Sequence, residues 1–299
     1  MEIGLLKSEQ RNKDTIGFPQ MSVSDMLAAI NREDQKVAIA VQAALPQIEK
    51  AIDLILPRMK QGGRIVYMGA GTSGRLGIMD AAECRPTYGV ATDRVTGLIA
   101  GGKDAIFNAK ENSEDLAEQG AEDLKTLGLT ALDTVVAAAA SGRTPYCIGG
   151  LDYARSIGAG TVAVSCNPNA IISHHADVGI EVETGAEVIM GSTRMKAGTA
   201  QKMVFNMLST VCMVRLGRTY DNLMVCLKCK NEKISNRIVR LFCEATGCTS
   251  KEEAQKYLSL VDGRLDAAVL LQMTKAEPSR VLEALNETEN IYDALKKLP

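Results

Sequence analysis

The chain has 299 residues, enough for one large domain or two, and its 46% hydrophobic and 23% charged residues are ordinary values for a globular protein with a full core. Its net charge is −2, it has no tryptophan, and aromatic residues make up 4%, which argues against a nucleic-acid binder, because such a protein needs a basic surface and aromatic side chains on which bases stack. No apolar run reaches the ~18 residues of a membrane span and the N-terminus lacks the apolar core of a secretion signal, so the sequence predicts a cytoplasmic protein that binds neither membrane nor nucleic acid.

The N-terminal part of the chain predicts a leader followed by helices. Residues 1–23 show no regular apolar pattern. Apolar side chains then recur at helical spacing over residues 24–30 and 33–61, and Pro46 is expected to bend the second of these helices. We expect the whole segment, residues 1–61, to pack on the domain that follows.

Short buried strands alternate with helices over residues 62–230. The expected strands are 64–69, 95–100, 134–140, 161–165 and 178–182. The expected helices are 74–84, 105–127, 145–158 and 196–216. Strands that are apolar on both faces and joined by helices are typical of a parallel sheet with helices on each side. The sequence therefore predicts a doubly wound α/β domain.

The strand pattern stops near residue 231. Helices are expected at 231–247, 251–260, 264–274 and 278–298. The apolar positions from Thr249 onward suit a small helical bundle of about 50 residues, a size that rarely folds alone. We predict a C-terminal helical region, residues 231–299, which docks on the sheet domain or on a partner subunit.

Two similar loops each follow a strand and open a helix. In an open parallel sheet ligands bind beyond the carboxyl ends of the strands. Glycine lets the backbone approach an anion, helix N-termini favour negative charge, and hydroxyl groups add donors. We therefore predict that the two loops bind phosphate. The candidate residues are Gly71, Thr72, Ser73, Gly74, Ser141, Gly142, Arg143 and Thr144.

Three other interpretations of these loops are weighed. The stretch from Gly69 to Gly74 matches the G-x-G-x-x-G pattern of dinucleotide sites, but no acidic residue for the ribose follows the second strand before Asp104. A P-loop requires Gly-Lys-Ser/Thr, which is absent. In the third interpretation the loops are tight turns without a ligand. The presence of two similar loops at one edge of a sheet disfavours it.

Cysteine and histidine give little support for a metal site. The cysteines considered as zinc ligands are Cys226, Cys229, Cys243 and Cys248. Their second spacing is not Cys-x2-Cys, so no metal is predicted. The chain has two histidines, His174 and His175, for which a loop or interface role is expected. Acid–base chemistry must therefore depend mainly on carboxylates.

Five segments resemble a known family. They are YMGAGTSGR (67–75), DAAEC (80–84), AASGRTPY (139–146), SCNP (165–168) and GSTRMKAGTAQK (191–202). Together they resemble the N-acetylmuramic acid 6-phosphate etherases of the sugar-isomerase (SIS) domain superfamily. The resemblance runs from about residue 25 to the C-terminus, and the last segment is long and specific.

The resemblance implies a reaction and a set of residues. The family cleaves the lactyl ether at carbon 3 of the sugar, giving N-acetylglucosamine 6-phosphate and D-lactate during recycling of the bacterial cell wall. It implies no metal or organic cofactor, and a homodimer with sites near the interface. It also implies acid–base roles for Glu83 and Glu114. In the last segment, the candidates for contacts with the substrate are Ser192, Thr193, Arg194 and Lys196; Arg194, Lys196 and Lys202 are the candidate cations for the lactyl carboxylate.

The chemistry needs one acid and one base. An open-chain sugar has an aldehyde at carbon 1 that acidifies the hydrogen on carbon 2. A base removes that hydrogen, lactate leaves from carbon 3 and water adds back. Two glutamates suffice if their environments push their pKa values apart. The family suggests Glu83 as the acid and Glu114 as the carbon 2 base; the sequence alone does not order them.

One distance challenges this assignment. If all nine residues from Gly74 to Glu83 are helical, Glu83 lies about 13–14 Å along the helix axis, farther than a hexose phosphate reaches. Either the helix breaks early, or the phosphate binds mainly at 141–144, or Glu83 serves a site completed by another subunit. Two other functions stay open at this point: an aldose–ketose phosphosugar isomerase, and a non-catalytic sugar-phosphate sensor.

Overall fold

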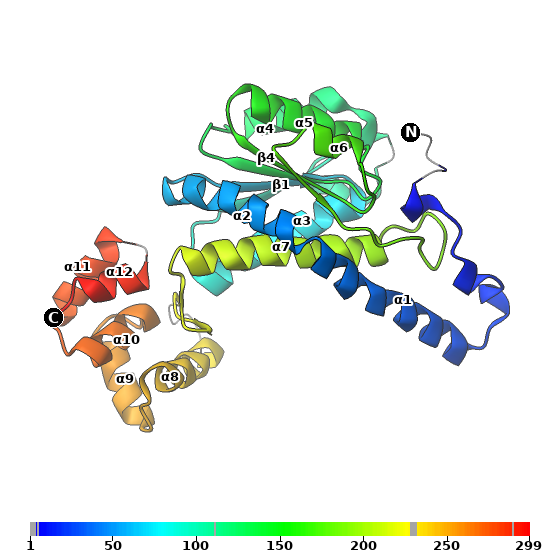
Figure 1. Cartoon of the computed structure of the whole chain (residues 1–299). Coiled ribbons are helices and arrows are strands. Elements are labelled where there is room, and N and C mark those ends of the chain that lie inside the picture. The colour runs from blue at the N-terminus through cyan, green and yellow to red at the C-terminus, as the bar shows by residue number, and fades with distance from the viewer. Residues whose placement is uncertain (1–3, 5, 111, 228–231, 289) are drawn as a thin grey trace. The chain divides into compact units, whose positions relative to one another are not determined.

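The computed structural model describes residues 4, 6–110, 112–227, 232–288 and 290–299 (Figure 1). The chain divides into two compact units. Unit 1 comprises Met1–Ala82 and Thr92–Ser209, and unit 2 comprises Glu83–Ala91 and Thr210–Pro299.

Unit 1 is built on a five-stranded parallel sheet in the order β2-β1-β3-β4-β5. The strands are β1 (Ile65–Gly69), β2 (Val95–Ile99), β3 (Thr134–Ala138), β4 (Gly160–Ser165) and β5 (Val178–Glu181). Every residue of β1, β3 and β4 is buried, as expected for strands that helices cover on both faces. The predicted doubly wound α/β fold is confirmed.

Helices lie on both faces of this sheet (Figure 1). One face carries α4 (Ala117–Thr126), α5 (Pro145–Ser156) and α6 (Ile171–His174). The other carries α2 (Leu45–Lys60) and the unit 1 parts of α3 (Gly71–Tyr88) and α7 (Lys196–Arg215). The side chains of adjacent residues in β1 point to opposite faces of the sheet. Tyr67 contacts Phe205 of α7, with ring centroids 4.6 Å apart, whereas Met68 packs closely against Gly150 of α5.

Two helix predictions for unit 1 differ from the structure. Residues expected to form one bent helix belong to α1 (Val23–Ala43) and α2, and Pro46 lies in the first turn of α2, where its missing N–H is tolerated. The long helix expected at 105–127 is wrong. Asn112 has a φ of 66°, a left-handed conformation that no α-helix contains, so α4 begins only at Ala117. Before it lie two short 3-10 turns, η5 (Lys103–Ile106) and η6 (Ser113–Asp115).

The leader is more ordered than its sequence indicates. Its described residues include the 3-10 turns η2 (Lys7–Glu9), η3 (Lys13–Thr15) and η4 (Phe18–Gln20). Thr15 donates its hydroxyl to the carbonyl of Val188 at 2.9 Å, and Asn12 donates its side-chain amide to the carbonyl of Ala186 at 3.3 Å. These long-range bonds hold the leader along the segment before α7.

Besides the ends of α3 and α7, the described residues of unit 2 form further helices and a small antiparallel hairpin, β6 (Thr219–Tyr220) and β7 (Leu223–Met224). The further helices are α8 (Glu232–Thr246), α9 (Lys251–Ser259), α10 (Leu265–Thr274), α11 (Pro278–Glu287) and α12 (Ile291–Lys296). All residues from Leu265 to Leu271 are buried, because α10 packs against α8, α9, α11 and α12. The predicted C-terminal helical region is present, with α10 as its central helix. The single helix expected at 278–298 is instead two helices, α11 and α12, because the backbone is extended at Thr288 and Asn290.

Candidate active site

The two predicted phosphate loops leave the sheet side by side. The chain leaves β1 at Gly69 and β3 at Ala138, and these residues are in register across the sheet. Neighbouring strands lie about 4.8 Å apart, so the loops at 71–74 and 141–144 begin at the same edge. The strand order reverses here, with β2 on one side of β1 and β3 on the other. Such a switch point is where open α/β sheets bind ligands.

The first loop is the start of α3. Gly71 is exposed with a φ of 52°, and Thr72 is half-buried. Gly74 has no room for a side chain, because a Cβ there would lie 2.6 Å from the carbonyl oxygen of Gly69. Close packing of α3 on the strand end therefore accounts for Gly74, and Gly71 and Thr72 are left at the surface.

The remaining hydroxyl of this loop faces α7. Ser73 is only 7% exposed, and its hydroxyl donates to Oε1 of Gln201 at 2.8 Å. Gln201 is itself 1% exposed. No local sequence signal predicts this contact, since 128 residues separate the partners.

The second loop packs against the start of α6. Gly142 has a φ of 72° and its Cβ would lie 2.5 Å from that of Ala170, so only glycine fits. Its carbonyl accepts a hydrogen bond from the backbone of Ile172 at 2.9 Å. The half-buried residues of the loop are Ser141, Arg143 and Thr144.

Asn167 joins this loop to the leader. Its side-chain nitrogen lies 3.0 Å from the carbonyl of Ala140 and 2.9 Å from the hydroxyl oxygen of Ser8. In return, the backbone N–H of Ser8 donates to Asn167 Oδ1 at 3.1 Å. Both Ser8 and Asn167 are fully buried. Leader and loop thus share one partner, although no local sequence signal reveals it.

The segment 191–196 leads into α7, whose first turn is already occupied. Glu187 is fully buried, and its carboxylate accepts the backbone N–H groups of Lys196 and Ala197, each at 3.0 Å. Burial raises the pKa of Glu187, against the hydrogen bonds that lower it. Glu187 acts here as the cap of α7, satisfying two donors of its first turn.

Lys196 is engaged in an ion pair. Its side chain is 3% exposed, and its ammonium lies 2.6 Å from Oε2 of Glu33 in α1. Burial acts to raise the Glu33 pKa, but hydrogen bonds from Lys196 and Lys36 outweigh it and hold that pKa below its ordinary value. Lys196 therefore ties α7 to α1. Of the other two candidate cations, both Arg194 and Lys202 are exposed.

The remaining predicted contacts of this segment lie beside Arg194. Ser192 and Thr193 are half-buried in a turn in which the N–H of Ser192 donates to the carbonyl of Ile189 at 3.0 Å. Their hydroxyls stay candidates for substrate contact.

Glu114 lies close to the first turn of α5. It is exposed, in η6, and η6 packs against α5, the helix that the second loop opens. The Glu114 charge is close enough to Cys147, in the first turn of α5, to help burial raise the pKa of that thiol to about 12. Unit 1 thus contains both loops and one of the two candidate carboxylates.

Glu83 is not brought to them within unit 1. It is exposed and belongs to unit 2. α3 runs unbroken from Gly71 to Tyr88, so Glu83 lies about 15 Å along the helix axis from Ser73. The first explanation for the distance problem, an early break in the helix, is therefore excluded.

Neither a cluster of metal-ligating side chains nor a membrane-spanning helix is found in the described parts of the chain. No group of three or more metal-ligating side chains occurs there. Cys229 of the zinc interpretation lies outside the described residues. His175 pairs with Asp152, Nδ1 to Oδ1 at 2.6 Å, and His174 is exposed at the end of α6. None of the helices described is long and apolar enough to cross a bilayer.

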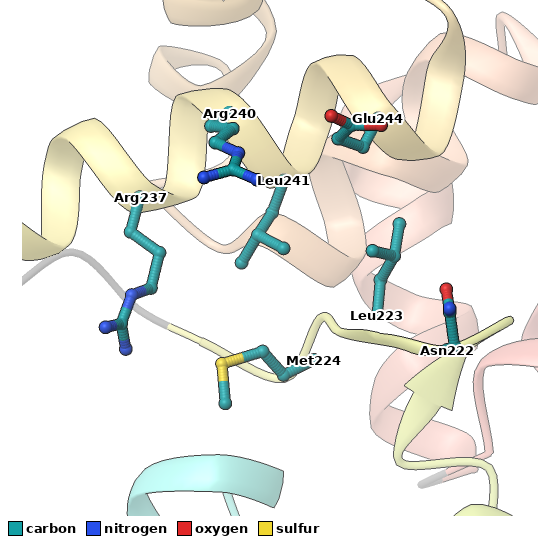
Figure 2. Close-up of a pocket in the computed structure, with 7 residues that line it drawn as sticks. All are labelled: Asn222, Leu223, Met224, Arg237, Arg240, Leu241 and Glu244. Atoms are coloured by element: carbon teal, nitrogen blue, oxygen red, sulfur yellow. The ribbon is translucent and has the colours of Figure 1, made fainter.

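A surface pocket of about 480 Å³ lies in unit 2, between α8 and residues 222–224 (Figure 2). Arg237 and Arg240 project into it from α8, and Met224 lies opposite them. Both arginines are exposed. Its lining includes none of the residues that the sequence predicts for the site.

Comparisons with known proteins agree with the fold and the motifs. Residues 47–155 match the family model of the glucokinase regulatory protein N-terminal SIS domain, and residues 237–271 match a UBA-like domain. N-acetylmuramic acid 6-phosphate etherase 2 of Lactiplantibacillus plantarum is 52% identical over 96% of this chain and 97% of its own length. The N-acetylmuramic acid 6-phosphate etherase of Clostridium beijerinckii is 51% identical over 98% of this chain and 96% of its own. That of Exiguobacterium sp. is 51% identical over 89% and 90%.

Such identity over nearly the full length of both chains agrees with the motif at 191–202 and with the sheet that carries the two loops. The chain belongs to the N-acetylmuramic acid 6-phosphate etherase family.

Proposed function

We propose that this protein cleaves the lactyl ether of N-acetylmuramic acid 6-phosphate, giving N-acetylglucosamine 6-phosphate and D-lactate, and that it is a carbon–oxygen lyase. The observation that carries the proposal is the near-full-length identity of at least 51% to the etherases of three organisms. The site at the switch point supports it, because two loops with hydroxyl groups and helix N-termini suit the phosphoryl group.

The reaction runs as an elimination followed by an addition. A carboxylate removes the proton from carbon 2 of the open-chain sugar. The electron pair forms a double bond between carbons 2 and 3, the bond from carbon 3 to oxygen breaks, and an acid protonates the departing lactate. Water then adds to carbon 3 and a proton returns to carbon 2.

We assign the carbon 2 base to Glu114 and the acid to Glu83. The position of Glu114 beside α5 supports its role, because a phosphoryl group at the second loop places the sugar next to it. Ser192, Thr193 and Arg194 are proposed to contact the rest of the substrate. Arg194 suits the lactyl carboxylate, since it is exposed whereas Lys196 is paired with Glu33.

The distance along α3 supports a homodimer. About 15 Å of continuous helix separates Ser73 from Glu83. This is longer than a hexose phosphate, so Ser73 and Glu83 of one subunit do not suit the same substrate molecule. We propose that Glu83 acts on substrate held by the partner subunit.

The proposed reaction belongs in the cytoplasm, because charged sugar phosphates do not cross a bilayer and are retained there. It serves the recycling of cell-wall amino sugars.

The test is to incubate the protein with N-acetylmuramic acid 6-phosphate in deuterium oxide, and separately in water enriched in oxygen-18. We expect D-lactate, deuterium at carbon 2 and the heavy oxygen at carbon 3. Absence of lactate would contradict the proposal; in that case isomerisation of another sugar phosphate identifies an isomerase, and saturable binding without turnover identifies a sensor.

A further inference from the structure

The contact between Ser73 and Gln201 has an unbalanced hydrogen-bond pattern. Ser73 donates its single hydroxyl hydrogen to Oε1 of Gln201 at 2.8 Å. The nitrogen of the same amide, Nε2, is buried and has no hydrogen-bond partner among the residues that the structure describes. Burying an amide donor without a hydrogen-bond partner costs free energy, so the orientation of this amide is unfavourable.

A phosphoryl group makes the opposite demand on Ser73. Phosphate oxygens only accept hydrogen bonds, so Ser73 binds one only by donating its hydroxyl hydrogen to it. In the structure that hydrogen points to Gln201 instead. A half-turn of the terminal amide of Gln201 exchanges its oxygen and nitrogen, which have nearly the same shape. Nε2 then donates to the hydroxyl oxygen of Ser73, and the serine hydrogen is released toward the ligand.

We propose that Gln201 is a positioning residue for the substrate phosphoryl group: its amide sets Ser73 as a hydrogen-bond donor at the start of α3. The inference rests on the proposed function only in that a sugar phosphate is the ligand. Gln201 itself does not touch the reacting carbons. Its burial at 1% exposure, against Ser73 at 7%, keeps water from replacing either partner.

The variant Gln201→Glu tests this role, because it keeps the shape of the side chain. An ionised carboxylate only accepts, so it holds the Ser73 hydrogen inward and adds a negative charge near the ligand. At pH 8 we expect the dissociation constant for N-acetylglucosamine 6-phosphate, and the KM for N-acetylmuramic acid 6-phosphate, to rise on the order of tenfold or more. The kcat should change less, since the reacting carbons are remote from the phosphoryl group.

The pH dependence separates this role from a structural one. Burial raises the pKa of a carboxyl, and a protonated Glu at position 201 has an O–H that donates to Ser73. Relative to the unchanged protein at each pH, the variant should therefore recover affinity as the pH falls from 8 to 6. The comparison with the unchanged protein removes the contribution of the phosphate itself, whose second pKa is about 6.

Two further variants complete the test. Gln201→Met keeps the volume without donor or acceptor and should weaken binding at every pH without recovery. Gln47→Glu places the same charge on a half-buried glutamine of α2 and should leave affinity unchanged. Calorimetric titration with N-acetylglucosamine 6-phosphate, inorganic phosphate and unphosphorylated N-acetylglucosamine measures binding without turnover.

Unchanged phosphate affinity in both variants at position 201, or an equal loss at pH 6 and pH 8 in Gln201→Glu, would overturn the inference. If Gln201→Glu does not fold, Gln201→Met decides, since an unaffected affinity in that variant is equally contradictory. If the unchanged protein releases no lactate, the proposed function fails, while the calorimetric comparison still decides the role of Gln201.

Discussion

The first turns of α3 and α7 differ in what they hold. At α7, the buried carboxylate of Glu187 accepts two backbone N–H groups, so the positive end of this helix is already neutralised by the protein. At α3, no carboxylate is bonded to the first turn among the described residues; Gly71 is exposed there and Ser73 faces Gln201. A motif at a helix start therefore does not identify a binding site until the partners of its N–H groups are known. One start is part of the scaffold, and the other is available to a ligand.

The same distinction separates the charged residues. Lys196 and Glu33 are buried and paired, whereas Glu83 and Glu114 are exposed. The first pair should govern the stability of the fold and the second pair the reaction. Substitutions in each pair test this division.

Removal of the proposed base should nearly abolish turnover. Glu114→Gln should lower the rate of lactate release by about 10²–10⁴-fold, the usual contribution of a positioned acid or base. Because Glu114 is exposed, the midpoint of thermal unfolding should not change. Exchange of the carbon 2 proton with deuterium oxide should stop as well. Glu118→Gln, an exposed neighbour in α4, serves as the matched control, and a loss of similar size there would count against the assignment.

Disruption of the buried pair should affect stability instead. Glu33→Gln leaves the Lys196 ammonium buried without its counter-charge, which should lower the free energy of unfolding by about 3 kcal/mol. Denaturant unfolding measures this. Asp14→Asn, at an exposed partner of Lys36, should give no measurable change. An unaltered unfolding curve for Glu33→Gln would show that the pair does not hold α1 to α7.

The pair also gives a pH dependence. The Glu33 pKa in the folded chain lies below its ordinary value of 4.5, so the folded state prefers the ionised carboxylate. Its stabilising contribution is therefore complete above pH 4.5 and is lost as the pH falls through the lowered pKa. Between pH 6 and pH 3 the unchanged protein should lose more unfolding free energy than Glu33→Gln. An equal loss of unfolding free energy between pH 6 and pH 3 in the two proteins would contradict the prediction.

Some of this arrangement is predictable from sequence and some is not. Runs such as IVYMG at 65–69 are apolar at every position, which identifies strands buried on both faces, and the loops after β1 and β3 follow directly. The helix expected at 105–127 failed because helical spacing of apolar residues does not show that Asn112 adopts a positive φ.

Contacts between residues far apart in the chain cannot be predicted from local sequence patterns. Glu33 and Lys196 are 163 residues apart, and Ser8 and Asn167 are 159 apart. Which of two similar-looking polar residues becomes part of the scaffold depends on tertiary contacts. This is why Lys196 is a candidate for substrate binding in the sequence, whereas the structure pairs it with Glu33. The predicted domain boundaries at 61/62 and 230/231 stay a prediction.

The hydroxyl groups of the two loops should have intermediate effects. Ser73→Ala removes one donor to the phosphoryl group and should raise KM on the order of tenfold, with Ser141→Ala similar. Thr199→Ala, at an exposed position of α7, should leave KM unchanged. Initial rates of lactate release measure all three. If only Ser141→Ala raised KM, the phosphoryl group would bind at the second loop alone.

The smallest effect should come from the cap of α7. Glu187→Ala removes the acceptor of two N–H groups and should lower the unfolding free energy by about 1–2 kcal/mol, with KM per folded molecule unchanged. Thermal unfolding together with initial rates measures both quantities. A large rise in KM with unchanged stability would place the start of α7 in the binding site and erase its difference from α3.

The most direct measurement is a structure of the protein with N-acetylglucosamine 6-phosphate bound. The account predicts the phosphoryl group beyond the ends of β1 and β3, with its oxygens about 3 Å from the hydroxyls of Ser73 and Ser141, and Gln201 Nε2 turned toward Ser73. A phosphoryl group bound elsewhere, for example beside Arg237 and Arg240 in the unit 2 pocket, would contradict it.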